Sequence, residues 1–335
     1  MKKISIISLF LAILLIFSTF SGCRAPTVHT EAFFFMDTVI GVTLYTEDTA
    51  KANALFDGCR ALLGELDRLW SRRESTSEIA AFNASAEGLN TPDARTLALI
   101  SSALDVAKKT NGAFDPTVTP LIDLWEAAGE SGVLPTDAAL NRALALVGFE
   151  RVQITEGRIE KTDPTVTLDL GGIGKGAAIQ ALLELLESSN VEGGLITFGS
   201  NVATFGKKPD GEPFRIALRD PKATGATVGV LQLEAGEVLS VSGDYERYVT
   251  VNGKRYHHIL DPASGYPAES GLSSVAVITF DGALADALST ALLVMGKDRA
   301  LEFYRSGAYS FEAILIGSDG SLTTTAGLGT AFTPN

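Results

Sequence analysis

The sequence predicts an α+β fold with antiparallel sheet, because short apolar strands cluster beyond residue 149 with few helices between them. The pair Asn252-Gly253, flanked by apolar runs, indicates a tight hairpin turn. A doubly wound parallel sheet needs a helix after almost every strand, and beyond residue 149 only residues 177–186 and 283–295 look helical. We therefore expect one compact unit over residues 33–335, preceded by a short polar tether at residues 23–32.

The expected strands share β-branched and aromatic residues and are bounded by turn formers. They are Phe33–Tyr45, Phe149–Ile154, Val166–Leu170, Leu195–Phe198, Phe214–Leu218, Val228–Leu233, Val238–Val241, Tyr248–Val251 and Ser274–Phe280.

Three helices are expected in the first part of the chain. They are Thr49–Ser71, a helix from Thr91-Pro92 to the residue before Asn111, and Thr136–Gly148. Thr91 and Thr136 are predicted N-caps, and Pro92 suits a first helical position. Apolar residues of the first helix recur at spacings of three and four and include Cys59, so we expect a buried core thiol and no nucleophile there.

The amino-acid composition excludes some classes of function. The 335 residues include 40 acidic and 27 basic side chains, a net charge of −13, and no basic cluster follows residue 3. Nucleic-acid binding requires a basic surface, so no nucleic-acid partner is expected. The hydrophobic content of 46% supports a large globular core.

The N-terminus is typical of a targeting segment. Lys2 and Lys3 precede an apolar stretch, Ile4–Phe20, which is short for a membrane span. Phe20-Ser21-Gly22-Cys23 resembles a bacterial lipobox, although Phe20 stands where Leu is usual. We expect residues 1–22 to be a signal peptide, Cys23 to be lipidated, and the protein to be extracytoplasmic and anchored to a bacterial membrane. The alternative is an ordinary secretory signal with a chance cysteine.

A glycine-rich segment, Asp169–Gly176, lies between an expected strand and an expected helix. Glycines allow close approach of the backbone to a phosphate, and a helix N-terminus attracts anions. The segment is no Walker A loop, because Gly176 follows Lys175, and its spacing fails the dinucleotide fingerprint. A tight turn with an exposed lysine is the alternative.

Asp286 and Thr290 lie four apart on an expected helix, so their oxygens share one face. A carboxylate and a hydroxyl suit Mg²⁺, whose other ligands can be phosphates and waters. Local helix hydrogen bonds are the simpler explanation.

Two of the three histidines are adjacent, His257 and His258. In a strand their rings point to opposite faces, so they are not expected to share a metal. Either one is a candidate general base, and either one is equally compatible with a structural role.

Seven short blocks occur in one order. They are Met36-Asp37-Thr38, Ser77-Glu78-Ile79 with Asn83, Gly112–Pro116, Asp169–Gly176, Ser242–Arg247, His258–Pro262 with Gly265, and Asp286–Thr290. Together they resemble the ApbE family, the FAD:protein FMN transferases, over about residues 33–300.

The resemblance implies a fold of two T-fold-like antiparallel sheet and helix halves. It also implies Mg²⁺-dependent transfer of FMN from FAD to a Thr or Ser of an exported acceptor protein, with release of AMP. An Rnf- or Nqr-type electron-transfer subunit is the kind of acceptor expected. By position, Asp286, Thr290 and the Gly172 carbonyl become metal ligands, and His258 becomes the catalytic base. The implied FAD contacts are Met36, Ala113, Phe114, Asp115, Asp169, Lys175 and the Leu260 backbone.

This chain departs from the family pattern in three places. Asp37 replaces the usual Gly, and Ser289 stands where some members have a second acidic residue. Arg73 stands where many members carry a Tyr that stacks on the flavin, so we expect its guanidinium at that position.

Rival functions use the same residues. An FAD pyrophosphatase giving FMN and AMP would need the same site with water as the nucleophile. A flavin-binding lipoprotein without turnover would not need His258. A surface lipoprotein engaged only in protein contacts leaves the Asp/Thr and glycine-rich blocks unexplained.

Overall fold

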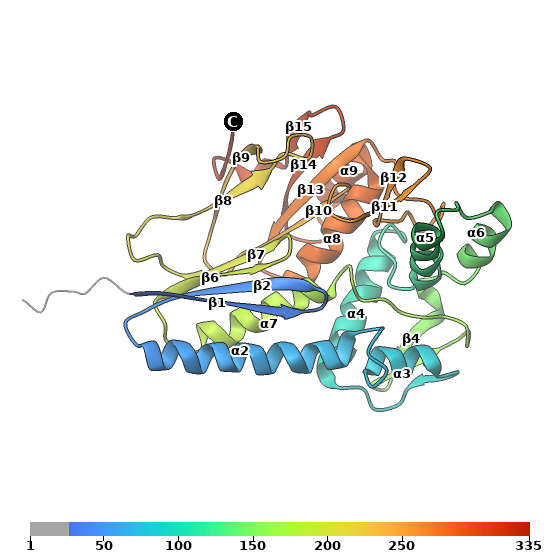
Figure 1. Ribbon diagram of the computed structural model, residues 1–335, viewed down its shortest axis with the longest axis horizontal. Helices are drawn as coiled ribbons and strands as arrows, with labels where there is room; N and C mark the ends of the chain where they lie inside the picture. Colours follow the sequence, from blue (N-terminus) through green and yellow to red (C-terminus); the bar gives the residue numbers. More distant parts are fainter. Residues whose placement is uncertain (1–26) are drawn as a thin grey trace, which may run out of the picture.

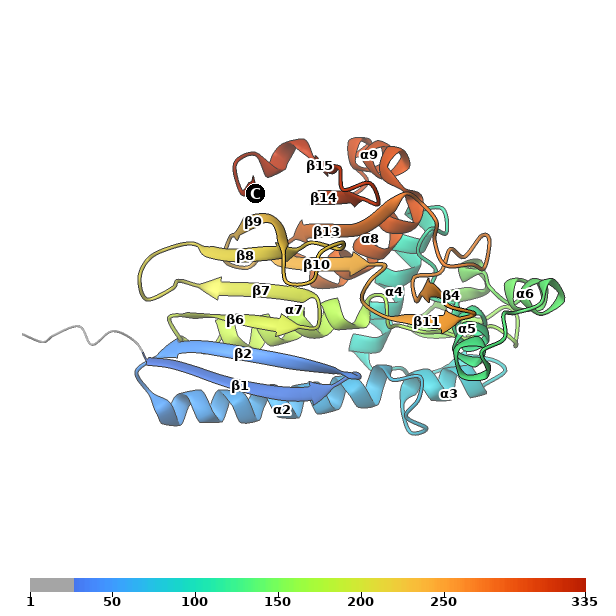
Figure 2. The same ribbon diagram turned by 45° about the horizontal axis from the view of Figure 1, so that its top comes forward.

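A computed structural model describes residues 27–335. Its centre is one eight-stranded antiparallel sheet in the order β1-β2-β6-β7-β10-β13-β14-β15. Helices cover one face of this sheet (Figures 1 and 2). The predicted α+β class is confirmed.

The sheet consists of two halves with the same order of elements: strand, strand, helix, helix, strand, strand. The first half comprises β1 (Thr27–Phe35), β2 (Thr38–Thr46), α2 (Thr49–Trp70), α7 (Gly174–Glu187), β6 (Gly193–Phe198) and β7 (Asn201–Gly206). The second comprises β10 (Val238–Gly243), β13 (Leu272–Thr279), α8 (Gly282–Met295), α9 (Lys297–Ser306), β14 (Glu312–Gly317) and β15 (Leu322–Thr324). β7 and β10 join the halves edge to edge, so the two T-fold-like units form one continuous sheet.

Insertions between these elements build the remaining structure. Residues 71–173 hold α3 (Glu78–Ala84), β3 (Gly88–Leu89), α4 (Ala94–Lys109), α5 (Thr119–Ser131), α6 (Asp137–Leu144), η1 (Phe149–Arg151), β4 (Val152–Thr155) and β5 (Arg158–Lys161). Later insertions hold β8 (Phe214–Arg219), β9 (Thr227–Leu233), β11 (Tyr248–Val251) and β12 (Lys254–His257), and the chain ends with η2 (Ala326–Leu328) and β16 (Phe332–Pro334).

The apolar interior divides into three clusters. The largest lies between the sheet and its helices and includes Cys59, whose side chain is fully buried. Burial raises the pKa of this thiol to about 12, which fits the expected inert core cysteine. A second cluster lies between β8, β9, β16 and the other face of β10, β13 and β14. The third joins α5 and α6 to Leu260.

Two boundaries at the N-terminal end were wrong. The expected single strand Phe33–Tyr45 is two strands, because Met36 and Asp37 adopt left-handed φ values of 50° and 57° and reverse the chain. The expected tether, residues 23–32, overlaps β1, which begins at Thr27 and pairs along its whole length with β2. Cys23 and the predicted signal peptide lie outside the described residues.

Three further boundaries differ. Residues Val166–Leu170 form no strand, because the Asn83 side chain takes the place of a neighbouring strand and bonds both the N–H and the carbonyl of Leu168. The helix expected from Thr91 begins at Ala94, with Asp93 as its N-cap. Phe149–Ile154 divides into the 3₁₀ turn η1 and strand β4.

The expected N-cap Thr136 is confirmed for α6, but its predicted end was wrong, because the helix stops at Leu144 and not at Gly148. The Asn252-Gly253 turn connects β11 and β12, with both residues at positive φ. Within residues 27–335, no helix is long and apolar enough to cross a membrane.

Candidate active site

A cavity of about 860 Å³ lies where the end of the large sheet meets the insertions. It is within the range of about 300–1,000 Å³ usual for small-molecule sites. All of the sequence-predicted residues that the structure describes lie on its wall: Met36, Arg73, Ala113, Phe114, Asp115, Asp169, Gly172, Lys175, His258, Leu260, Asp286 and Thr290. Segments more than 250 residues apart therefore meet at one place, while the chemical roles of these residues stay predictions.

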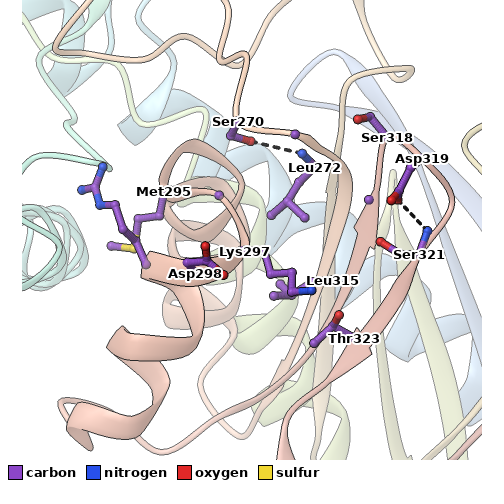
Figure 3. A pocket seen from close by; sticks show the side chains of 14 residues that line it. Ser270, Leu272, Met295, Lys297, Asp298, Leu315, Ser318, Asp319, Ser321 and Thr323 are labelled. Atoms are coloured by element: carbon purple, nitrogen blue, oxygen red, sulfur yellow. Dashed lines mark hydrogen bonds between the residues drawn. The ribbon is translucent and has the colours of Figure 1, made fainter.

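A second cavity, of about 620 Å³, lies beside β13, β14 and the start of α9 (Figure 3). Its polar groups serve local turns: Ser270 Oγ accepts from the Leu272 N–H, and Asp319 accepts from the Ser321 N–H. None of the predicted residues lies on its wall.

The glycine-rich loop places a cation and a helix N-terminus on the main cavity wall. Asp169 Oδ1 accepts from the Gly171 N–H at 2.7 Å, which fixes the turn leading into α7. Lys175 Nζ then reaches back to the Gly171 carbonyl at 2.6 Å. The N-cap residue of α7, Ile173, gives no side-chain cap, and the ammonium of Lys175 lies on the cavity wall at the positive end of this helix. The Gly174 N–H bonds the Leu170 carbonyl, and the Gly176 N–H bonds Asp286. This arrangement suits a phosphate group.

Asp286 lies at the junction of the two halves and is 4% exposed. Its Oδ2 accepts from the Gly176 N–H at 3.0 Å and lies 3.6 Å from Lys175 Nζ. Its Oδ1 accepts from Asn201 Nδ2 at 3.3 Å and from Ser240 Oγ at 3.2 Å. Donors from both halves therefore fix the carboxylate in one orientation.

The oxygen donors around Asp286 fit a hard cation. Thr290 Oγ1 lies one turn further along α8, within 3.3 Å of Ser242 Oγ. A Cβ built on Gly172 would lie 3.8 Å from Thr290 Oγ1, so the Gly172 backbone is close to the same point. Lys175 already places a positive charge between Asp286 and a main-chain carbonyl. One carboxylate, one hydroxyl and backbone carbonyls match the preference of Mg²⁺, and residues 27–335 hold no cluster of three His, Cys, Asp or Glu.

Asp115 shapes the site from behind. It is 7% exposed, and its carboxylate accepts from Thr117 Oγ1 at 2.6 Å and from the backbone N–H groups of Thr117 and Phe149. Burial raises the pKa of this carboxyl group. These bonds hold the loop that presses Phe114 against Gly172, where an added Cβ would lie 3.1 Å from the ring.

The neighbours Arg72 and Arg73 differ in environment. The Arg73 side chain is 61% exposed, and its guanidinium pairs with Glu126 at 2.6 Å at the cavity rim. Arg72 is 15% exposed and bonds Asp169 at 2.7 Å, Asp123 at 2.7 Å and Glu126 at 3.2 Å. Arg72, which the sequence did not single out, therefore connects the glycine-rich loop to α5 across the cavity.

The two histidines face different surroundings. His258 lies on the cavity wall, and its Nδ1 is 3.1 Å from the Arg247 carbonyl, which selects the tautomer with a proton on Nδ1. His258 is solvent-exposed, yet the protein atoms packed around its ring, and then the positive charge of Arg247, hold its pKa below the usual value. His257 is partly buried and directs Nε2 to the Ala268 carbonyl at 3.1 Å. The two rings thus have different hydrogen-bond partners, although both residues line the cavity, and their orientation to opposite faces stays a prediction.

Several wall residues escaped prediction. Trp125, Tyr248 and Tyr256 supply aromatic surface, with the rings of Trp125 and Tyr256 5.0 Å apart. The indole N–H of Trp70 is buried and has no acceptor within residues 27–335. The position of Tyr256 directly before the two histidines was a signal that could have placed it in the site. Nothing in the local sequence marks Trp70.

The fold and the cavity define a class: an α+β protein of two joined halves, with its site at the end of the shared sheet. The ApbE family model matches residues 36–315. The chain belongs to the ApbE family.

Relatives match over most of their length. The FAD:protein FMN transferase of Haemophilus influenzae is 32% identical over 286 residues, covering 82% of each chain. That of Vibrio cholerae is 32% identical over 291 residues, covering 84% of this chain and 86% of the relative. Among solved structures, the ApbE protein of Thermotoga maritima aligns with a TM-score of 0.82 at 30% identity, covering 91% of this chain and 99% of its own. The apo flavinyl transferase ApbE of Pseudomonas stutzeri aligns with a TM-score of 0.81 at 29% identity, covering 93% and 99%.

Proposed function

We propose that this protein is an FAD:protein FMN transferase, the activity named for its relatives. The observation that carries the proposal is the meeting of Lys175, Asp286 and His258 on one cavity wall. A cation, a carboxylate and a neutral imidazole are the groups that transfer of a phosphate-linked flavin requires.

Binding of FAD depends on the α7 end of the cavity. The ammonium of Lys175, at the positive N-terminal end of α7, holds the pyrophosphate and stabilises the charge that develops on it. Trp125 and Tyr256 offer flat apolar surface to the ring systems of FAD. Arg72 keeps the glycine-rich loop and α5 at a fixed separation by bonding both.

His258 acts as the base. With Nδ1–H donating to the Arg247 carbonyl, Nε2 keeps its lone pair for a proton. The acceptor hydroxyl gives its proton to Nε2 while its oxygen bonds the FMN phosphorus. The bond from that phosphorus to the AMP oxygen breaks, and AMP leaves. The depressed pKa keeps the ring neutral and available at neutral pH.

Asp286, Thr290 and the Gly172 carbonyl would hold Mg²⁺, as their hard oxygens fit this ion. When bound, Mg²⁺ supplies positive charge to the phosphate oxygens. Asn201 and Ser240 keep the Asp286 carboxylate oriented toward that position.

The test separates transfer from hydrolysis. The purified protein is incubated with FAD, Mg²⁺ and the acceptor domain of an Rnf- or Nqr-type subunit, and the acceptor mass is measured. We expect a gain of one FMN and release of AMP. Conversion of FAD to FMN and AMP with no gain in acceptor mass would instead establish the pyrophosphatase.

The protein is proposed to act outside the cytoplasm, anchored through a lipid on Cys23 with residues 1–22 removed. The lipobox-like sequence supports this proposal. Residues 33–335 then form the catalytic unit, extended by the part of β1 that begins at Thr27. Acceptors on the same side of the membrane are its proposed partners.

A further inference from the structure

The open face of the large sheet is uncharged along three strands. The three-stranded sheet of β8, β9 and β16 covers β10, β13 and β14 and leaves most of β1 and β2 open (Figure 2). It reaches β2 at the end away from the cavity, where Phe214 of β8 stacks on Tyr45 with the ring centroids 6.4 Å apart. Side chains alternate along β1, β2 and β6: one set faces α2 and the core, the other faces outward. The outward positions are alternate residues 28–34 and 39–45, with 195 and 197, and none carries a charge.

Large apolar side chains on this face are open to solvent. Phe34 is 67% exposed and Val39 is 61% exposed, and the two lie opposite each other in the β1–β2 register. Ala32 and Gly41 form the next outward pair. The solvated face of an antiparallel sheet is ordinarily polar, so an open apolar face beside a binding site marks an interaction surface.

This face runs into the cavity. Directly after Phe34 and Phe35, the turn residues Met36, Asp37 and Thr38 form part of the cavity wall. The neighbouring Gly199 also lines the cavity, and its N–H bonds the Val39 carbonyl. A protein whose hydroxyl enters the cavity over this rim therefore passes beside the outward face of β1 and β2.

We propose that the outward face of β1 and β2, centred on Phe34 and Val39, docks the folded acceptor protein. The inference rests on the proposed function, because transfer to a protein requires such a contact. The partner it fits has an uncharged apolar surface beside its hydroxyl-bearing segment. The net charge of −13 disfavours an anionic lipid surface as the occupant.

The test uses the full-length protein in detergent and two variants. Phe34→Glu places a charge at the centre of the face. Val28→Glu is the matched control, because Val28 is 57% exposed on the same face of β1 but at the end away from the cavity. Both positions are exposed, so both variants should keep the melting temperature and the FAD affinity of the parent.

The probe is the acceptor domain of an Rnf- or Nqr-type subunit, with its modified residue replaced by Ala for binding and intact for transfer. We expect Phe34→Glu to weaken binding and raise the KM for the domain about tenfold, as loss of a central apolar contact does. It should leave transfer to a short peptide of the acceptor segment unchanged. Val28→Glu should change neither value by more than about twofold.

The outcomes separate the two proposals. Equal binding by the parent and Phe34→Glu, or equal losses in both variants, would overturn the docking surface. A halved mass for Phe34→Glu in sedimentation would also overturn it, by showing that the face joins two copies of this chain. No FMN transfer by the parent protein to either probe would instead reject the transferase function.

Discussion

At the scale of single residues, substitution of Asp286 tests the proposed Mg²⁺ site. We predict that Asp286→Asn abolishes Mg²⁺ binding, because it removes the carboxylate charge while the amide oxygen still accepts from the Gly176 N–H. Asp286→Ala should also lose Mg²⁺-dependent turnover, with a lower melting temperature because buried donors from Asn201 and Ser240 lose their acceptor. Titration calorimetry with Mg²⁺ is the measurement. Unchanged Mg²⁺ affinity in Asp286→Asn would place the cation elsewhere.

His258 should control both the rate of FMN transfer and the fall of that rate at low pH. We predict that His258→Ala binds FAD normally and transfers FMN about 10²–10⁴ times more slowly. Because the pKa of His258 lies below its usual value of about 6.5, the ring stays neutral at pH 6.5, and kcat should fall only as the pH drops below that point. His257→Ala should be mild. A pH–rate profile of the parent whose acid limb lies above pH 7 would contradict this assignment.

Arg72 and Arg73 show what sequence could not resolve. Both follow α2, which ends at Trp70, and no periodic pattern beyond a helix end tells which of two adjacent side chains turns inward. The Asp286–Thr290 pair was predictable because one helix turn relates the two residues. Asn201 and Ser240 were not, since they reach the carboxylate from separate strands.

We predict that Arg72→Met weakens FAD binding about tenfold, because Asp169 and the loop after it lose their link to α5 and leave a carboxylate unpaired. Arg73→Met should change the affinity little, since its partner Glu126 is also held by Arg72. Flavin fluorescence gives both dissociation constants. If Arg72→Met and Arg73→Met changed the FAD dissociation constant equally, the buried position of Arg72 would give it no special part in FAD binding.

At the scale of elements, α7 and α8 cross at two glycines. A Cβ on Gly176 would lie 1.9 Å from the Gly282 carbonyl oxygen, and a Cβ on Gly282 would lie 2.3 Å from that of Gly176. These glycines permit backbone contact between the two halves, directly beside Lys175 and Asp286.

We predict that Gly176→Ala lowers the free energy of unfolding by about 3 kcal/mol or more, since backbone cannot yield as a side chain does. Gly58→Ala in α2 is the matched control: its nearest neighbour would be the Leu185 side chain at 3.7 Å, so higher helix propensity should stabilise by up to about 1 kcal/mol. Denaturant titration measures both. If Gly176→Ala lowered the free energy of unfolding no more than Gly58→Ala does, α7 and α8 would not be in close backbone contact at Gly176.

Elements with strong local signals were predictable, and those fixed by distant partners were not. The period of α2 and the Asn252-Gly253 turn are local, and both were found. Val166–Leu170 has strand composition, yet its backbone bonds go to the Asn83 side chain, 85 residues away from Leu168. The left-handed pair Met36-Asp37 was missed because Met rarely adopts positive φ.

At the scale of the whole molecule, the proposed attachment to the membrane depends on Cys23, which lies outside the described residues. We predict that Cys23→Ser moves the protein from the membrane to the soluble fraction, because the lipid on Cys23 is the proposed anchor. Fractionation with immunodetection follows the change. A Cys23→Ser protein that still sediments with membranes and resists salt washing would exclude the lipid anchor.

The cavity wall collects residues from Met36 to Thr290 and from two separate insertions. The site is therefore incomplete in a partly folded chain. If only the first half is folded, Lys175 is present without Asp286. If only the second half is folded, the Asp286 carboxylate is present without the Lys175 ammonium. The site is complete only where the two halves meet at Gly176 and Gly282. Chains that lack either half should therefore leave FAD untouched.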